Sequence, residues 1–552
     1  MFVRVKTNGT YEYLQIVENR RESGKVRQQV IASLGRLDKL TASGRLDDLV
    51  CALGRFCKRV RIIDAQRDGS LTSRAVRKIG PALAFEKLWR EMGIAEVLKE
   101  LLSGRRFRFD VERALFLTVL HRLFASGSDR QADRWREDFL IEGVEMLGLH
   151  HLYRAMAWLG EKLPRCEQDA ATPFSSRCTK DLVEEALFSR RRDLFSTLDL
   201  VFFDTTSIYF EGAGGETLGR RGNSKDSRPD LLQMVVGAAL DGQGRPICCE
   251  MWPGNTADVK TLVPVVERLR SRFGIGGLCI VADRGMISAD TVEKLESRDD
   301  IEYILGARMR RCKEVRNDVL AHAGAWEVVY PKSPLPKDPS PLKVKEVVVK
   351  SGDEAHRYIV CYNEDQAKKD AADRAAIVTA LAEQLKAGDK QLVGNKGYRK
   401  YLKSCGARFE IDENKIRAEA RYDGIWGLRT NTSLSAKDVA LKYKQLWMVE
   451  QVFRTTKSIL LTRPIFHKRD ETIRGHVFCS FLALIVKAEL FERLEGRGHL
   501  YEWNDIRRDL EALNETELVI DDKTYYVRTP LRGTVTDVLR AAGVALPPWL
   551  RR

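Results

Sequence analysis

The chain has 552 residues, too many for a single small binding module, because a compact domain holds about 150 residues. Its 93 lysine and arginine residues exceed its 78 aspartate and glutamate residues, which gives a net charge of +15 and favours polyanionic partners. Hydrophobic residues make up 44% and charged residues 31% of the chain. This is the composition of a folded globular protein, so a disordered basic tail is excluded.

The eleven cysteines are scattered and form no CxxC pair, which argues against a disulfide framework and a zinc ribbon. The longest apolar run, residues 477–486, is about half of the ~20 residues needed to cross a bilayer and predicts a buried core helix. We therefore expect a protein of the reducing cytoplasm, with no membrane partner.

The sequence of the first 190 residues predicts two regions, neither of which contains a recognisable catalytic motif. Residues 1–75 alternate polar and apolar side chains around an Asn8-Gly9 turn and end in a basic stretch, which predicts a small basic hairpin module. Residues 76–190 show helical periodicity with arginines between the apolar positions. This pattern predicts a basic helical region, whose charge suits a polyanion such as DNA.

Residues 191–307 change to a β pattern. Three strand-like runs are followed by a helix, the short apolar strand LCIVAD, a second helix and the strand YILGA, so the predicted order is β-β-β-α-β-α-β. Strands linked by helices run parallel, whereas the first three are joined by turns. The fold class predicted is therefore α/β with a mixed sheet.

The rest of the chain divides into three parts. Residues 308–433, which include a proline-rich segment at 331–341, predict a mostly β insertion into the sheet domain, with strands near Phe409 and over 417–428. Residues 434–495 predict a long helix from Ser435 past Leu461 and then a buried helix. Residues 496–552 predict a tail of helix, hairpin and helix.

Two aspartates follow apolar runs that predict core strands. Asp204 comes after Leu200–Phe203, and Asp283 comes after Leu278–Ala282. A carboxylate at the end of a buried strand is costly unless it is compensated, so each is either a strand-end cap or part of a charged site. A third acid, on a later helix, favours the charged site over two separate strand-end caps.

Glu450 is that third acid. Tyr443, Glu450 and Lys457 are spaced seven apart, and a heptad drifts by only ~20° on a helix, so the three share one stripe. A polar helical stripe is most often a solvated face. Here an apolar helix presents a carboxylate between a phenol and an ammonium group, which suggests a functional face. His467 and His476, which flank the next helix, are interpreted as packing residues.

With these residues the chain resembles the DDE transposases of bacterial insertion sequences, in particular the insertion-sequence-four-like group. Their signature is Y, two residues, R, three residues, E, six residues, K, and Tyr443, Glu450 and Lys457 match it. Leu446 stands at the arginine position. Other segments carry the same resemblance: DTTSIYFEG, KDSRPDLLQ, PGNTAD, ADRGM, YDGIWGLRTN and RPIFH.

The resemblance implies an RNase H-like core in which Asp204, Asp283 and Glu450 are catalytic and bind two metal ions. Donor sets made only of oxygen select hard cations, so Mg²⁺ or Mn²⁺ is expected. DNA-binding roles are implied for the remaining candidates, which are Tyr443, Lys457, Arg454, Arg284 and Trp426. In this group an aromatic residue of the insertion stacks on a base while a DNA hairpin forms, and Trp426 is the candidate; a core tryptophan is the other interpretation.

The function implied is cut-and-paste DNA transposition. The protein would bind terminal inverted repeats, cleave there, and transfer the freed strand to target DNA as a homodimer. Two alternatives remain at the level of sequence: a related metal-dependent nuclease, and a catalytically inactive DNA-binding protein derived from a transposase.

Overall fold

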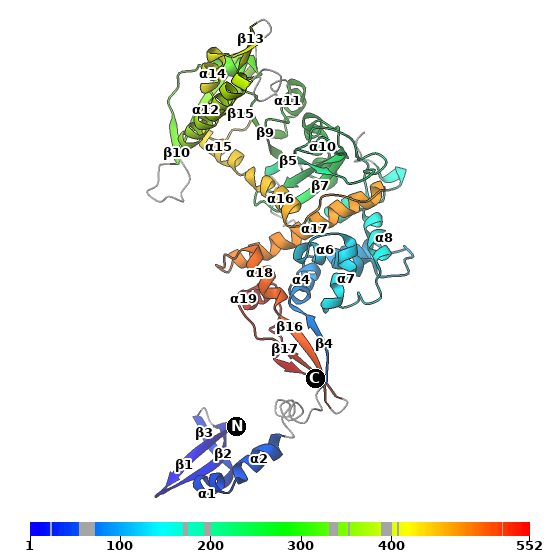
Figure 1. Ribbon diagram of the computed structural model, residues 1–552, viewed down its shortest axis with the longest axis vertical. Helices are drawn as coiled ribbons and strands as arrows, with labels where there is room; N and C mark the ends of the chain where they lie inside the picture. The colour runs from blue at the N-terminus through cyan, green and yellow to red at the C-terminus, as the bar shows by residue number, and fades with distance from the viewer. Residues whose placement is uncertain are drawn as a thin grey trace.

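The computed structural model describes residues 1–22, 25–54, 72–168, 175–191, 200–275, 277–330, 341–351, 354–387, 400–405, 408–520 and 523–552 (Figure 1). The basic stretch that ends the N-terminal module and nearly all of the proline-rich segment lie outside these ranges. None of the helices in this described part of the chain combines the length and the apolar character needed to span a membrane.

The N-terminal module is a three-stranded antiparallel sheet with two helices. Strands β1 (Phe2–Asn8) and β2 (Tyr11–Glu22) form the expected hairpin, and β3 (Lys25–Arg36) pairs with the other edge of β2. The turn uses Gly9, whose φ is +62°, a conformation that glycine adopts without a steric penalty. Helices α1 (Leu37–Ala42) and α2 (Arg45–Gly54) follow.

The helical region and the C-terminal part of the chain share one hydrophobic core. It consists of α4 (Gly80–Glu91), α5 (Ile94–Leu101), α6 (Val111–Phe124), α7 (Asp129–Trp135), α8 (Leu149–Leu159) and α9 (Thr179–Arg191). The long helix α17 (Asp470–Glu495) packs against α4, α6 and α8 and also reaches the sheet (Figure 1). This core continues past residue 495, the boundary that the sequence predicts for the tail, into residues of the tail itself.

The tail confirms the predicted helix, hairpin and helix as α18 (Trp503–Glu511), β16 (Asn514–Ile520), β17 (Lys523–Arg528) and α19 (Val535–Ala541). Its hairpin joins a four-stranded sheet in the order β18-β17-β16-β4, with β18 (Leu550–Arg551) at one edge. The other edge, β4 (Thr72–Lys78), comes from more than 400 residues earlier. Pairing across such a separation leaves no local signal in the sequence.

The central sheet has nine strands in the order β10-β11-β12-β15-β9-β8-β5-β6-β7. Its first part is β5 (Leu200–Tyr209), β6 (Gln233–Leu240), β7 (Pro246–Pro253), α10 (Leu262–Phe273), β8 (Leu278–Ala282), α11 (Ala289–Glu296) and β9 (Ile301–Gly306). This is the predicted β-β-β-α-β-α-β order. β8 runs parallel to both β5 and β9, so the mixed α/β class and the RNase H-like strand order are confirmed.

Most strands of the insertion extend this sheet, and only β13 and β14 form a separate two-stranded sheet among the described residues. Its strands β10 (Glu327–Tyr330), β11 (Leu342–Ser351), β12 (Glu354–Asn363) and β15 (Ile425–Thr430) continue from β9. Between β12 and β15 the chain forms helix α12 (Glu364–Ala387) and the hairpin of β13 (Leu402–Cys405) and β14 (Arg408–Ile411). The strand expected over 417–428 is wrong in its first half, because Asp412 caps the helix α14 (Glu413–Ala420) by accepting from Asn414 and Lys415.

The expected long helix from Ser435 is in fact two helices, α15 (Ala436–Lys444) and α16 (Trp447–Ser458). Between them the hydrogen bonds tighten to a three-residue step, from Leu446 N to Tyr443 O and from Val449 N to Leu446 O. The side chain of Leu446 is buried in the core beneath the two helices. This tight turn ends one helix and begins the next, so Tyr443 lies on a different helix from Glu450.

Helices α8 and α17 approach each other through glycine. A Cβ atom on Gly475 would lie 1.9 Å from the carbonyl oxygen of Met156, and one on Gly160 would lie 1.9 Å from that of Glu471. We predict that Gly475→Ala lowers the free energy of unfolding by about 2 kcal/mol or more, because backbone must move to admit the methyl group. Chemical denaturation would measure this.

The matched control is Gly277→Ala, since a Cβ atom there meets no atom of the described residues within 4 Å. Equal stability of the two variants would contradict the close packing of α8 against α17.

Candidate active site

Asp204 and Asp283 lie side by side on adjacent parallel strands. The last paired residues of β5 and β8 are Phe203 and Ala282, and each aspartate is the next residue of the chain, with Asp283 directly after the end of β8. Neighbouring strands are about 4.8 Å apart. Asp204 is not at the end of its strand as expected, because β5 continues to Tyr209 along β6 after β8 has stopped.

The side chain of Asp204 lies on the face of the sheet that α15 and α16 cover. Alternate residues of a strand share a face, and Phe202, two positions earlier, belongs to the core formed with Val449 and Phe453 of α16. Val201 and Phe203 instead pack on the opposite face under α10 and α11. The alternation of β5 therefore directs Asp204 toward the helix that carries Glu450.

Burial raises the pKa of the Asp204 carboxyl to about 6. The Lys225 ammonium group and the backbone N–H of Thr205, which donates to Oδ1 at 2.7 Å, act in the opposite direction and favour the charged form of this carboxyl. The charges of Asp283 and Asp258 add to the rise. Three acids around one site thus make its ionised form costly in the absence of a cation.

Lys225 and Asp258 are residues of this site that we did not predict. The Lys225 ammonium donates to the carbonyl and hydroxyl oxygens of Thr205 at 2.7 and 2.9 Å and pairs with Asp258 at 3.2 Å. The Thr205 hydroxyl donates to Asp258 at 2.8 Å. Lys225 begins the motif KDSRPDLLQ, and Asp258 ends the motif PGNTAD. Both motifs carry the family resemblance, which was the only indication in the sequence that these residues belong to the site.

Tyr443 contacts the second aspartate directly. Its hydroxyl donates to Oδ1 of Asp283 at 3.0 Å. Burial raises the pKa of the Tyr443 phenol, and the nearby Asp283 charge raises it further. The phenol therefore stays protonated and holds the Asp283 carboxylate in place as a neutral donor.

Glu450 and Lys457 lie on α16, two turns apart. Val449 and Phe453 bury the other flank of the helix against the sheet, and Glu450 itself is exposed. Within the described ranges, Glu450 and the two aspartates do not form a group whose carboxylate oxygens all lie within 4.8 Å of one another. Lys457 instead pairs with Asp226 at 2.7 Å. Arg454 is exposed on the same helix.

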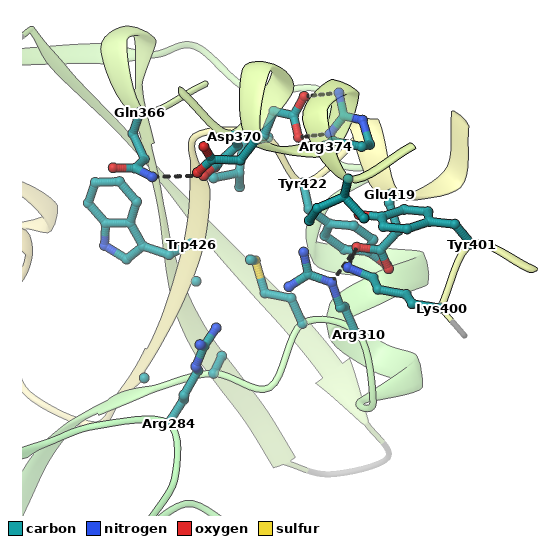
Figure 2. Close-up of a pocket in the computed structure, with 18 of the residues that line it drawn as sticks. Arg284, Arg310, Gln366, Asp370, Arg374, Lys400, Tyr401, Glu419, Tyr422 and Trp426 are labelled. Carbon is teal, nitrogen blue, oxygen red and sulfur yellow. Dashed lines mark hydrogen bonds and ion pairs between the residues drawn. The ribbon is translucent and has the colours of Figure 1, made fainter. Parts of the chain in front are cut away.

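A cavity of about 420 Å³ opens beside Asp283 and extends into the insertion (Figure 2). Arg284 and Tyr443 line it on the side of Asp283, and the half-buried Trp426 of β15 lines it from the insertion. Charged pairs such as Arg374 with Asp423 form the far wall. Three of the predicted DNA-binding residues thus border one cavity.

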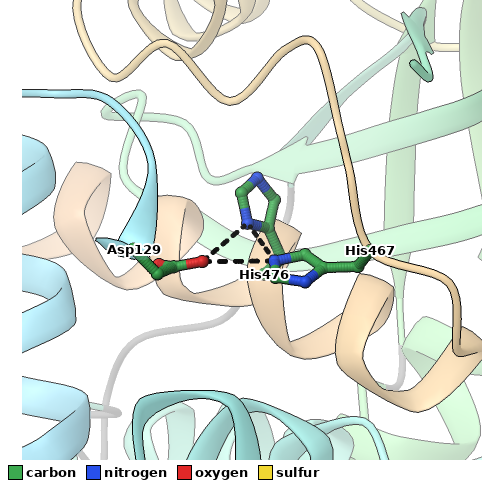
Figure 3. A group of neighbouring side chains, drawn as sticks. All are labelled: Asp129, His467 and His476. Atoms are coloured by element: carbon green, nitrogen blue, oxygen red, sulfur yellow. Dashed lines mark hydrogen bonds and ion pairs between the residues drawn. The ribbon is translucent and has the colours of Figure 1, made fainter. Parts of the chain in front are cut away.

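A separate group, Asp129, His467 and His476, joins the helical region to α17 (Figure 3). Its ligand atoms lie within 4.8 Å of one another. However, Arg122 approaches His476 Nδ1 at 2.9 Å, and His467 Nε2 lies 3.2 Å from Asp129. The guanidinium group takes the lone pair that a metal ion would need, so the group is a buried hydrogen-bond network. This agrees with the packing role expected for both histidines.

Residues 196–486, more than half of the chain, match the sequence model of the transposase DDE domain, so the chain belongs to the DDE transposase family. It is a DDE transposase of an insertion sequence, because residues 3–68 also match the IS1634 family transposase N-terminal domain. No curated protein matches the chain.

Two solved structures are similar to parts of the chain. One is "Mos1 transposase paired-end complex with left transposon end", at 12% identity and a TM-score of 0.14, covering 36% of this chain and 59% of that one. The other is "Crystal structure of the Mos1 mariner paired end complex with Mn", at 12% identity and a TM-score of 0.13, covering 35% and 58%. The chain thus spans less than two thirds of these proteins, and the family assignment does not depend on them.

The raised pKa of Asp204 predicts a pH dependence of stability in metal-free buffer. Because the folded state holds this proton more tightly than the unfolded chain, stability falls as pH rises from about 4 to about 6. We predict that Asp204→Asn, in a chelating buffer at pH 7.5, is about 1–3 kcal/mol more stable than wild type. Denaturant unfolding would measure the difference.

The difference between the two proteins should shrink at pH 4, where the wild-type carboxyl is protonated. Added Mg²⁺ or Mn²⁺ should stabilise wild type more than the variant. A variant less stable than wild type at pH 7.5 would contradict the prediction.

Proposed function

We propose that this chain binds the terminal inverted repeats of its own element, cleaves the DNA there, and joins the freed 3′ end to target DNA. The observation that carries the proposal is the juxtaposition of Asp204 and Asp283 on adjacent parallel strands, on the face covered by the helix of Glu450. The family assignment supports the same reaction class.

Asp204, Asp283 and Glu450 are proposed as the catalytic metal ligands. The donor set contains only carboxylate oxygen, and the charges of neighbouring acids raise the pKa of Asp204, so a hard divalent cation fits here. Two Mg²⁺ or Mn²⁺ ions, when bound, supply activation of the attacking oxygen and neutralisation of charge on the phosphate. Glu450 is exposed on α16, the helix that covers this face of the sheet, and is proposed as the third ligand.

The other residues position DNA in this proposal. Tyr443 orients Asp283 through its hydroxyl. Lys457 and Arg454 lie on the helix of Glu450, where positive charge would contact backbone phosphates. Arg284 borders the cavity next to Asp283.

The basic charge of the chain suits a substrate with one phosphate charge per nucleotide. We assign end binding to the N-terminal module and the helical region. Synapsis of two transposon ends in one complex would require a homodimer.

The first test uses a supercoiled plasmid that carries the DNA flanking the gene, incubated with the protein and Mg²⁺ or Mn²⁺. We expect cuts confined to the element's ends, followed by joined products, and loss of both with Asp283→Asn. The control is Asp290→Asn, whose carboxylate is 74% exposed on α11, and which should cut like wild type.

Mapping of the broken ends decides between functions. Cuts without joined products would indicate a nuclease. Binding to the flanks without any cut in either metal would indicate an inactive DNA-binding protein.

Trp426 is proposed to stack on a base displaced from the DNA end into the cavity of Figure 2. Replacing a terminal base by 2-aminopurine should give fluorescence that wild type quenches and Trp426→Ala does not. Because stacking contributes about 1–3 kcal/mol per base, affinity for the cleaved end should fall by about tenfold or more.

Trp426→Phe should retain most of the quenching, which separates stacking from packing. The matched control is Trp326→Ala, since Trp326 is a second insertion tryptophan, 39% exposed and outside the cavity. Equal effects of the two alanine variants would show that Trp426 is a core residue only.

A further inference from the structure

The family signature has an arginine at the position where this chain has Leu446. Leu446 is only 7% exposed and packs in the core, so its side chain lies away from any DNA path. Arg454 is on the correct helix, but it is exposed and has no partner that would fix its position within the described ranges. A positively charged side chain that takes the place of this arginine and is held in position would therefore come from another segment.

A buried carboxylate near the end of α16 holds two cations. The side chain of Asp226 is 4% exposed, and its Oδ1 accepts from the Lys457 ammonium at 2.7 Å. The guanidinium of Arg463 forms an ion pair with the same oxygen. The second oxygen, Oδ2, is buried and has no hydrogen-bond partner among the described residues.

Arg463 is fixed by more than this ion pair. Its guanidinium lies 5.7 Å from the ring centroid of Tyr209, the last residue of β5. Two residues further on, the backbone N–H of Ile465 donates to the Tyr209 carbonyl at 3.1 Å, and Ile465 accepts from Glu211 at 3.0 Å. The chain that carries Arg463 is therefore tied to the strand that carries Asp204.

The cluster of Asp226, Lys457 and Arg463 has an excess of positive charge. Two cations share one carboxylate, and the neighbouring Lys225 has its own partner in Asp258. Burial lowers the pKa of Lys457, and the charge of Arg463 lowers it further, while the bond to Asp226 opposes both. The side chains of Lys457 and Arg463 are still 13% and 28% exposed, so an anion can reach them from solvent.

We infer that Asp226 positions Lys457 and Arg463 as a two-cation site for one backbone phosphate of the DNA end, with Arg463 in place of the missing signature arginine. The inference rests on the proposed function. Lys457 is seven residues from Glu450, which is about 10 Å along a helix. Because the phosphates of one strand advance about 3.4 Å per nucleotide along the duplex axis, about 10 Å along that axis corresponds to a phosphate about three nucleotides from the cut.

The test uses duplexes that contain a mapped end of the element, each with one neutral methylphosphonate at a position one to six nucleotides from the cut. Binding is measured by fluorescence anisotropy in a Glu450→Gln background, which keeps the DNA intact. We expect one position, two to four nucleotides from the cut, to lower affinity by about tenfold.

In Arg463→Gln the effect of that position should become clearly smaller, because only Lys457 still contacts the phosphate. The slope of log affinity against log salt should fall by about 0.9, the value for one phosphate contact. Arg463→Lys should retain the position dependence. Arg298→Gln, which removes a surface arginine paired with Glu267, is the control and should behave like wild type.

Two results would overturn the inference. One is an Arg463→Gln variant with an unchanged salt slope and the full methylphosphonate effect. The other is an equal loss of affinity at every position together with a lower melting temperature, which would show a purely structural ion pair. If wild type neither cuts nor binds the flanking DNA, the proposed function fails first, and this outcome is distinct from both.

Discussion

The structure depends on the parallel register of β5 and β8, which puts two aspartates next to each other. Like charges on adjacent strands repel, and one of the two carboxyls is buried enough to hold a proton up to about pH 6. The surrounding residues offset only part of this repulsion. Lys225 and the Thr205 N–H act on Asp204, and the Tyr443 hydroxyl acts on Asp283. The remaining electrostatic strain favours a bound cation.

A second charged cluster lies on the far side of the sheet, between the sheet and the helical region. Arg272 of α10 is fully buried and pairs with Glu184 of α9 at 2.6 Å and with Glu250 of β7 at 3.1 Å. Lys180 donates to the carbonyl of Cys249 at 2.7 Å. Buried ion pairs add little net stability, but breaking one leaves an uncompensated charge. They therefore fix how the helical region meets the sheet.

The sequence was sufficient for the parts of the fold that local patterns specify. Apolar runs and turn residues predicted the strand order of the core, and the acids at Asp204 and Asp283 followed from their positions after those runs. Long-range pairing was not predictable, since β4 meets the tail across more than 400 residues. The partners of Asp226 were missed for the same reason, because Lys457 and Arg463 are more than 200 residues away.

The turn between α15 and α16 explains why the signature departs from its pattern at Leu446. A spacing of seven places side chains on one stripe only along a continuous helix, and the three-residue hydrogen-bond step at Leu446 ends one helix and begins the next. Tyr443 and Lys457 therefore have separate partners, Asp283 and Asp226. Position 446 itself turns into the core, where an arginine would be buried without an acidic partner among the apolar side chains of that cluster. Leucine therefore fits position 446, because the backbone there turns the side chain into the apolar core. The same turn joins the helix of Tyr443 to the helix of Glu450 and Lys457.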